Sequence, residues 1–157
     1  MTTATQVLEL CQGRRLMVAT AESCTGGLVA GALTAVAGSS AVVERGFVTY
    51  SNEAKAEMLG VPMALIDAHG AVSEPVARAM AAGALAHSRA DLAVAVTGIA
   101  GPGGGSADKP VGLVHFAAAR RDGPVLARHH VFPGDRDAVR AHSVQTALDL
   151  LAEIAHI

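Results

Sequence analysis

The chain has 157 residues, a length that suits one domain whose core needs no disulfide or metal to hold it together. Apolar residues make up 51% of it and aromatic residues only 3%, so alanine, valine and leucine must form that core. The net charge of −2, with both signs mixed along the chain, argues against the basic surface that nucleic-acid binding requires. No apolar run approaches the roughly 18 residues of a membrane-spanning helix.

Two features of the sequence indicate a cytoplasmic protein. The N-terminus lacks the basic segment followed by an apolar stretch that marks a secretion signal. The two cysteines, Cys11 and Cys24, do not have the spacing of a disulfide framework, so free thiols in a reducing compartment are expected.

The first half of the chain is predicted to alternate between helices and strands. In chain order, the apolar pattern predicts an amphipathic helix over 4–12, a buried strand over 15–21, a helix over 24–37 and a strand over 45–50. The segment "SNEAKAEML" then has the signals of a short helix. Ser51 or Asn52 can cap its start, and Gly60-Val61-Pro62 ends it.

The second half continues the alternation and ends with a hairpin and a helix. Ser73 can cap a helix over 74–88, which has Pro75 in its first turn. The next predicted elements are a buried strand over 90–98, a long irregular loop, two strands over 111–119 and 125–132 that form a hairpin, and a closing helix that starts at Asp135. This order predicts an α/β domain with helices on both faces of a mixed sheet.

Two glycine-rich turns stand out, and each follows a predicted strand. "TAESCTGG" (20–27) leads into the helix expected over 24–37, whose unpaired N–H groups suit an anion or a developing oxyanion. "TGIAGPGGG" (97–105) offers further backbone amides. Neither turn matches a nucleotide-binding fingerprint, and Ala21 stands where a nucleophile elbow would have its first glycine. A helix capped by Ser23 and a flexible surface connection are the purely structural alternatives.

The first turn contains two candidate nucleophiles, Ser23 and Cys24. A thiolate at Cys24 would need a lowered pKa, whereas Ser23 would need a base. Lys55 is one of only two lysines, and it follows Tyr50 at the start of a helix, where an unfavourable dipole and partial burial lower the pKa of an amine. A solvated surface lysine is the alternative for Lys55. His69 is the one histidine that falls in a predicted loop.

The histidines and cysteines do not form a metal-binding pattern. His129 and His130 are adjacent in a predicted strand, so they point to opposite faces and cannot chelate one ion together. There is no H-E-x-x-H sequence and no paired-cysteine motif. We therefore expect neither a metal site nor a cofactor.

Five segments of the chain together resemble the CinA C-terminal-domain family of nicotinamide-nucleotide amidohydrolases. In the family's order and spacing, they are "TAESCTGGLVAG", "AGSSAVVERGFVTYSNEAKAEMLGV", "HGAVSEPVA", "TGIAGPGGGSADKPVGLVHFA" and "FPGDRDAVR". The resemblance covers nearly the whole chain. It implies a single amidohydrolase domain over residues 1–157 in the stand-alone form, with a three-layer α/β/α sandwich and a mixed, mainly parallel sheet.

The resemblance also implies a reaction and its residues. The reaction is hydrolysis of the carboxamide of nicotinamide mononucleotide to nicotinic acid mononucleotide and ammonia, as part of pyridine-nucleotide recycling. The implied catalytic residues are Ser23 as nucleophile, Lys55 as base and Tyr50 beside them, with the oxyanion held at the start of the helix over 24–37. The substrate's phosphate needs donors, for which the candidates are Thr25, Gly26, Gly27, Thr97, Gly98, Gly101, Gly103, Arg136 and Arg140.

Two other interpretations stay open on the sequence alone. The same turns could bind a nucleotide or a partner domain without turnover, and a different amide could be the substrate. Alanine-rich helices and the habit of the family favour a homodimer.

Overall fold

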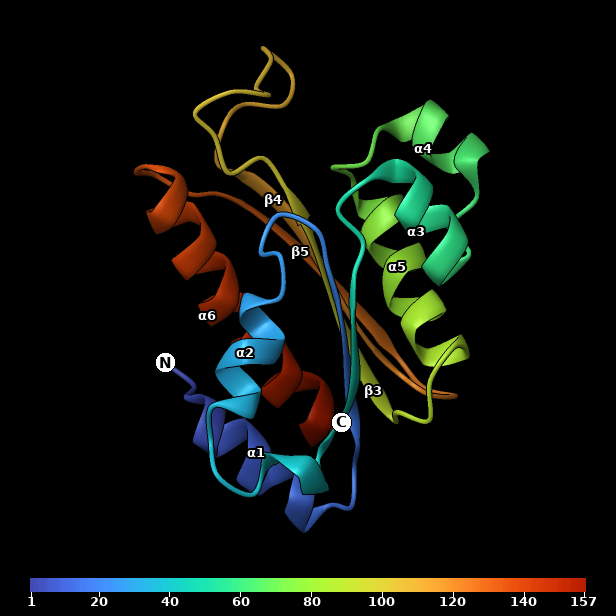
Figure 1. Ribbon diagram of the computed structural model, residues 1–157, viewed down its shortest axis with the longest axis vertical. Coiled ribbons are helices and arrows are strands. Elements are labelled where there is room, and N and C mark those ends of the chain that lie inside the picture. The colour runs from blue at the N-terminus through green and yellow to red at the C-terminus, as the bar shows by residue number, and fades with distance from the viewer.

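A five-stranded mixed sheet lies between two layers of helices in the computed structural model, which describes residues 1–157 (Figure 1). Its strands are β1 (Val18–Glu22), β2 (Val43–Val48), β3 (Leu92–Gly98), β4 (Leu113–Arg120) and β5 (Val125–Val131). The order across the sheet is β2-β1-β3-β4-β5. β1 pairs in parallel with both β2 and β3, whereas β4 runs antiparallel to β3 and to β5. The predicted three-layer α/β/α sandwich with a hairpin at the end is confirmed.

Helices form a layer on each face of the sheet (Figure 1). One layer contains α1 (Ala4–Gly13), α2 (Leu28–Thr34) and α6 (Arg136–His156), and the other contains α3 (Asn52–Leu59), α4 (Met63–His69) and α5 (Glu74–Ala86). A short 3-10 helix, Ser39–Ala41, precedes β2. None of these helices combines the length and the apolar character that crossing a membrane requires.

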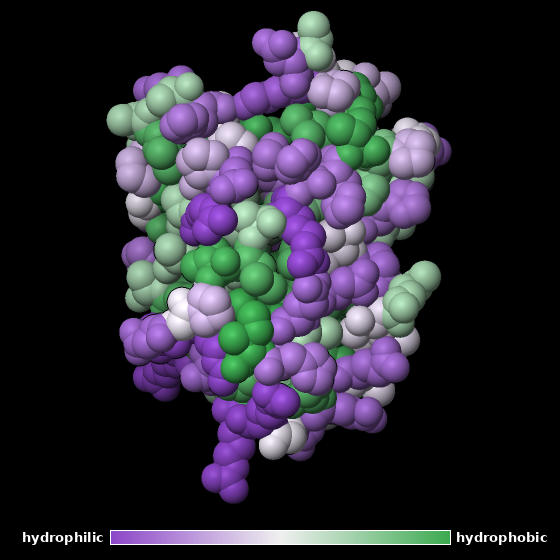
Figure 2. Space-filling view, turned by 180° about the vertical axis from the view of Figure 1, so that it is seen from behind, coloured by the Kyte–Doolittle hydropathy of each residue, from purple (hydrophilic) through white to green (hydrophobic).

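Successive strand residues point to opposite faces of the sheet, so each face has its own core layer. The two layers differ in side-chain size. Val94 and Val96 of β3 pack on the α6 side, whereas Ala93 and Ala95 pack on the α5 side. The alanines let α5 lie close to the sheet, and both core layers are built almost without aromatic residues, as the composition predicted. Figure 2 shows a largely hydrophilic surface with an apolar area near the middle of the face seen from behind.

Helix α3 has the boundaries that its capping signals predicted. The Ser51 side chain accepts a hydrogen bond from Ala54 N at 3.0 Å, and Gly60 ends the helix in the left-handed conformation with φ +69°. Asp135 caps α6 in the same way, accepting from Ala138 N at 2.9 Å. The capping residues alone therefore suffice to predict that Lys55 lies one turn into a helix.

The helix expected over 24–37 is wrong at both ends, since α2 spans only Leu28–Thr34. Gly26 and Gly27 have φ angles of +56° and +107°, so residues 24–27 form turns instead of a helix. Ser23 is consequently not the helix cap. The Glu22 carboxylate takes that role, accepting from Val29 N at 2.8 Å and from Ala30 N at 3.1 Å. Helix α4 had no counterpart among the predicted elements.

Candidate active site

The two glycine-rich turns meet at one edge of the sheet, beyond the carboxyl ends of β1 and β3. The chain leaves β1 toward the layer of α2 and leaves the neighbouring strand β2 toward the opposite layer, that of α3, which opens a crevice at the carboxyl ends of these strands. A cavity of about 280 Å³ occupies this position. Side chains and backbone from both turns line it, together with the end of β2, the start of α3, the segment before α5 and the start of α6.

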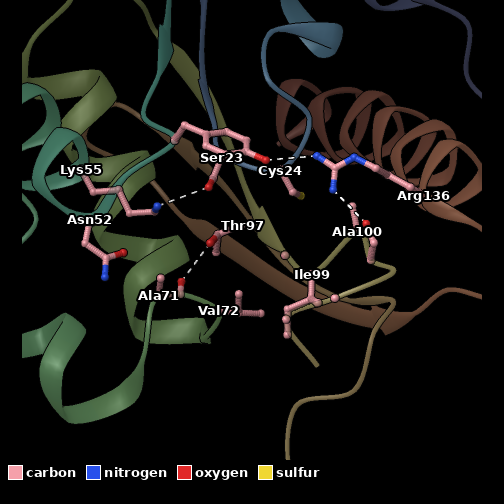
Figure 3. A pocket seen from close by; sticks show the side chains of 15 residues that line it. Ser23, Cys24, Asn52, Lys55, Ala71, Val72, Thr97, Ile99, Ala100 and Arg136 are labelled. Atoms are coloured by element: carbon pink, nitrogen blue, oxygen red, sulfur yellow. Dashed lines mark hydrogen bonds between the residues drawn. The ribbon is translucent and has the colours of Figure 1, made fainter. Parts of the chain in front are cut away.

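Ser23 and Lys55 approach each other inside this cavity. Lys55 Nζ lies 3.2 Å from Ser23 Oγ, within hydrogen-bond distance (Figure 3). The lysine side chain is only 1% exposed, and no carboxylate forms an ion pair with it. Burial lowers the pKa of Lys55, and the weaker effects of Cys24 and Glu53 oppose this. An amine with a lowered pKa beside a serine hydroxyl is the arrangement of a base and its nucleophile.

Cys24 is the competing nucleophile, and burial shifts its pKa in the direction opposite to that of Lys55. Burial raises the pKa of its thiol to about 11, which keeps it protonated at neutral pH. Its side chain is 5% exposed and belongs to the core on the α6 side, although it also contacts the cavity. Both cysteines are free, as the sequence predicted.

The turn that carries Ser23 is anchored from both directions. Glu22 immediately before it is bound to the start of α2, and Ser23 N donates to Val96 O at 2.9 Å. From α6, Arg140 donates to Cys24 O at 3.1 Å and to Thr25 O at 3.3 Å. This fixed backbone gives Ser23 one position relative to Lys55.

The oxyanion site expected at the start of the helix over 24–37 would have to lie in a turn, because residues 24–27 are not helical and the Glu22 carboxylate occupies the N–H groups of Val29 and Ala30 in α2. The N–H groups of Cys24 and Thr25, directly after the nucleophile, donate no hydrogen bond within the protein. Of these two residues, Cys24 lines the cavity. The unoccupied donors thus lie next to Ser23 and not in the helix.

Arg136 joins three walls of the cavity. From the first turn of α6 it donates to Gly101 O at 2.9 Å in the second glycine-rich loop and to Tyr50 Oη at 3.1 Å (Figure 3). Tyr50 follows β2 and is 62% exposed at the rim. No hydrogen bond joins its hydroxyl to Ser23 or Lys55. On the opposite wall, Thr97 donates to Ala71 O at 2.9 Å.

The candidate substrate-binding residues divide into two sets. The residues that line the cavity are Thr97, Gly98, Gly101, Gly103 and Arg136. The residues that do not line it are Thr25, Gly26, Gly27 and Arg140. The left-handed backbone of the first turn and the two contacts from Arg140 hold the second set behind Ser23. His69 also lies outside the cavity, and its carbonyl accepts a hydrogen bond from Lys109.

Sequence reasoning missed several residues of the lining. They are Asn52, Ala71 and Val72, whereas Ile99, Ala100 and Gly104 belong to the glycine-rich turn 97–105 that the sequence indicated. Asn52 carried a usable signal, because it is the only asparagine of the chain and precedes Lys55 by three residues, which puts both on one helix face. Ala71 and Val72 carried none, since only the tertiary fold brings that segment to β3.

Comparison with known proteins identifies the family of this chain. The family model of the CinA C-terminal domain matches residues 1–155. The chain is 57% identical over 146 residues to the nicotinamide-nucleotide amidohydrolase PncC of Escherichia coli K12, covering 93% of this chain and 88% of that protein. It is 59% identical to a CinA-like protein of Mycolicibacterium gilvum, of which the match covers 34%.

The structure of a competence/damage-inducible protein from Agrobacterium tumefaciens is similar throughout. The two chains share 56% identity with a TM-score of 0.94, over 96% of this chain and 92% of the other.

Proposed function

Because the chain belongs to the CinA C-terminal domain family, we propose that it is an amidohydrolase that removes ammonia from a nicotinamide nucleotide. The observation that carries this proposal is the buried, unpaired Lys55 with its Nζ 3.2 Å from Ser23 Oγ in a cavity. The similarity to proteins named nicotinamide-nucleotide amidohydrolase supports the substrate class. The whole of residues 1–157 is proposed to form this one amidohydrolase domain.

In the first step, neutral Lys55 takes the Ser23 proton while Ser23 Oγ attacks the carbon of the substrate carboxamide. The negative charge develops on the amide oxygen, and the N–H group of Cys24 is proposed to bind it, since that donor is unoccupied next to the nucleophile. Lys55 then gives the proton to the leaving nitrogen. The C–N electron pair departs with that nitrogen as ammonia, and an acyl ester remains on Ser23.

In the second step, water releases the acid. Lys55 accepts a proton from the water as it attacks the ester, and returns the proton to Ser23 Oγ as the ester bond breaks. Tyr50 is not needed for either proton transfer, because its hydroxyl is bound to Arg136. We place its exposed ring against the substrate at the rim. No step in this scheme calls for a metal ion or cofactor.

The substrate that we propose is nicotinamide mononucleotide. The backbone of the second loop, at Gly101 and Gly103, and the Arg136 guanidinium offer donors for its phosphate. The glycines allow the close approach of a charged group to the main chain. The donors near Thr25 and Arg140 are less suited, because both side chains lie outside the cavity lining.

The test is ammonia release from nicotinamide mononucleotide by the wild type, by Ser23→Ala and by Lys55→Arg. Arginine fills similar space but keeps its proton at every working pH, so it cannot act as a base. Both variants are expected to lose at least about 100-fold in kcat while retaining the circular dichroism spectrum of the wild type. A folded Lys55→Arg with substantial activity would contradict the mechanism.

The same assay separates catalysis from simple binding. A wild type that binds the mononucleotide in calorimetry but releases no ammonia would be a binding module. A panel with free nicotinamide and other pyridine nucleotides would identify the amide that is cleaved.

We also propose a cytoplasmic homodimer. Edge strand β5 exposes Val125 and Val131, at 39% and 58%, and so offers apolar surface to a second copy. The alanines of α5 give less support than the sequence suggested, because half of them, Ala77, Ala81 and Ala84, are buried. Sedimentation velocity would measure the state of association.

A further inference from the structure

Among the side chains of the cavity with an oxygen or nitrogen atom, Asn52 is the one that makes no hydrogen bond within the protein. Each other lining side chain with an oxygen or nitrogen atom makes a hydrogen bond: Ser23 with Lys55, Tyr50 with Arg136, and Thr97 with Ala71 O. None of the hydrogen bonds of the chain involves the Asn52 carboxamide. A carboxamide left free in a cavity is an available donor and acceptor for a ligand.

The position of Asn52 relative to the nucleophile and base narrows what that ligand group can be. Asn52 and Lys55 are one turn apart on α3, and Figure 3 shows both side chains extending from this helix on the same side of the cavity. A carbonyl carbon placed on Ser23 Oγ must have its leaving group near Lys55 Nζ, which has to protonate it. The group that lies on this side is therefore the leaving nitrogen.

We propose that Asn52 Oδ1 accepts a hydrogen bond from the NH₂ group of the substrate carboxamide and thereby selects amides. This inference rests on the amidohydrolase function proposed above. Holding one N–H on Asn52 turns the lone pair of the nitrogen, which becomes pyramidal in the tetrahedral intermediate, toward the protonated Lys55. The proton moves from Nζ to nitrogen, the C–N bond breaks with its electron pair on nitrogen, and ammonia leaves.

The same contact disfavours the product. A carboxylate has only acceptor oxygens, so it cannot donate to Asn52 Oδ1, and the carboxamide would have to turn and offer Nδ2 instead. A site built to bind an N–H group discriminates strongly against a ligand that lacks it. The acid should consequently bind less tightly than the amide from which it was formed.

The experiment compares two substrates that share an acyl group but differ in the leaving group. Nicotinamide mononucleotide carries N–H donors, whereas the methyl ester of nicotinic acid mononucleotide has none. Asn52→Ala is expected to lower kcat/KM on the amide by about tenfold or more and on the ester by less than about threefold. Glu57→Ala, an exposed position on the same helix outside the cavity, should change neither.

A second measurement uses the product and does not depend on ester turnover. Inhibition by nicotinic acid mononucleotide should become stronger relative to amide binding in Asn52→Ala, because the opposing acceptor is gone. Equal losses on amide and ester with an unchanged product-to-amide ratio would overturn the proposal, as would an unimpaired variant. A wild type inactive on both substrates would instead refute the amidohydrolase function itself, and the role of Asn52 with it.

Discussion

The two glycine-rich turns look alike in the sequence but are held in the structure by different means. The first, residues 23–27, is short and largely buried; Arg140 of α6 donates to it, and hydrogen bonds from the start of α2 to Glu22 join its two ends. The second, between β3 and β4, is long and exposed over 102–108; Arg136 donates to its Gly101 O, and its own Lys109 donates to His69 O. The first holds a side chain in place, whereas the second presents backbone to the cavity.

This difference teaches that glycine serves two purposes at one site. In the first turn, Gly26 and Gly27 let the chain reverse between β1 and α2 without contacting the cavity themselves. In the second, Gly98, Gly101, Gly103 and Gly104 are part of the wall. Changes in the first turn should therefore act on the chemical step, and changes in the second on substrate binding.

The largest effect on activity is expected from substitution of Lys55, the base that contacts Ser23 of the first turn. Lys55→Met keeps the length of the side chain and removes the base, so ammonia release should fall by at least about 100-fold. The variant should nevertheless be more stable than the wild type, because it no longer buries an amine that has no ion-pair partner. Differential scanning calorimetry beside the activity assay measures both effects.

The dependence on pH has a defined sign. Burial lowers the pKa of Lys55 in the folded state below its ordinary value of 10.5, so the unfolded chain binds more protons between these two values. Wild-type stability should therefore gain from this group as the pH rises through that interval, and the advantage of Lys55→Met should be greatest on the acidic side. The rate of the wild type should rise with pH and level off above the lowered pKa. A rate that falls over this interval would contradict a neutral-lysine base.

Glu22 tests whether the first turn depends on its anchors. Glu22→Ala leaves the buried N–H of Val29 and that of Ala30 without their acceptor, which should cost about 1–3 kcal/mol in the free energy of unfolding. Glu22→Gln retains an acceptor oxygen and should lose less. Urea denaturation measures the difference, and equal stability of wild type and Glu22→Ala would show that the carboxylate does not hold the turn.

Two arginines one turn apart on α6 offer a matched pair for the comparison of the loops. Arg140→Lys loses the paired contacts to Cys24 O and Thr25 O, and we expect kcat to fall several-fold with KM nearly constant. Arg136→Lys loosens the second loop, and KM should rise on the order of tenfold with a smaller change in kcat. The reverse assignment of kcat and KM effects would break the division of labour between the loops.

Tyr50→Phe should have the smallest effect. It removes one hydrogen bond from Arg136 at an exposed rim position but keeps the ring, so kcat/KM is expected to fall only about twofold to fivefold. Steady-state kinetics on the mononucleotide provides the measurement. A loss above about 100-fold would instead assign the phenol a part in proton transfer.

The two turns also show which parts of the structure could be predicted from the sequence. Capping residues such as Ser51 and Asp135 act within one turn of the chain, so the starts of α3 and α6 could be predicted from local pattern. The start of α2 could not be predicted from local pattern. Its cap is the Glu22 carboxylate, which is separated from the helix by a turn with two left-handed glycines. Ser23 and Lys55 were candidates by residue type and by family resemblance, but their distance was not predictable from either segment alone.

The sequence by itself determined the order of the strands and of every helix except α4, the alanine- and valine-rich core and the two breaks at which a site could form. Periodicity, caps and glycines are short-range properties, and they sufficed for these. Only the tertiary structure decided that β1 and β3 are neighbours, that Lys55 is buried beside Ser23, and that Asn52 faces the same cavity while Arg140 lies behind it. Burial and proximity depend on residues far apart in the chain, and for Lys55 it is burial that lowers the pKa of the amine.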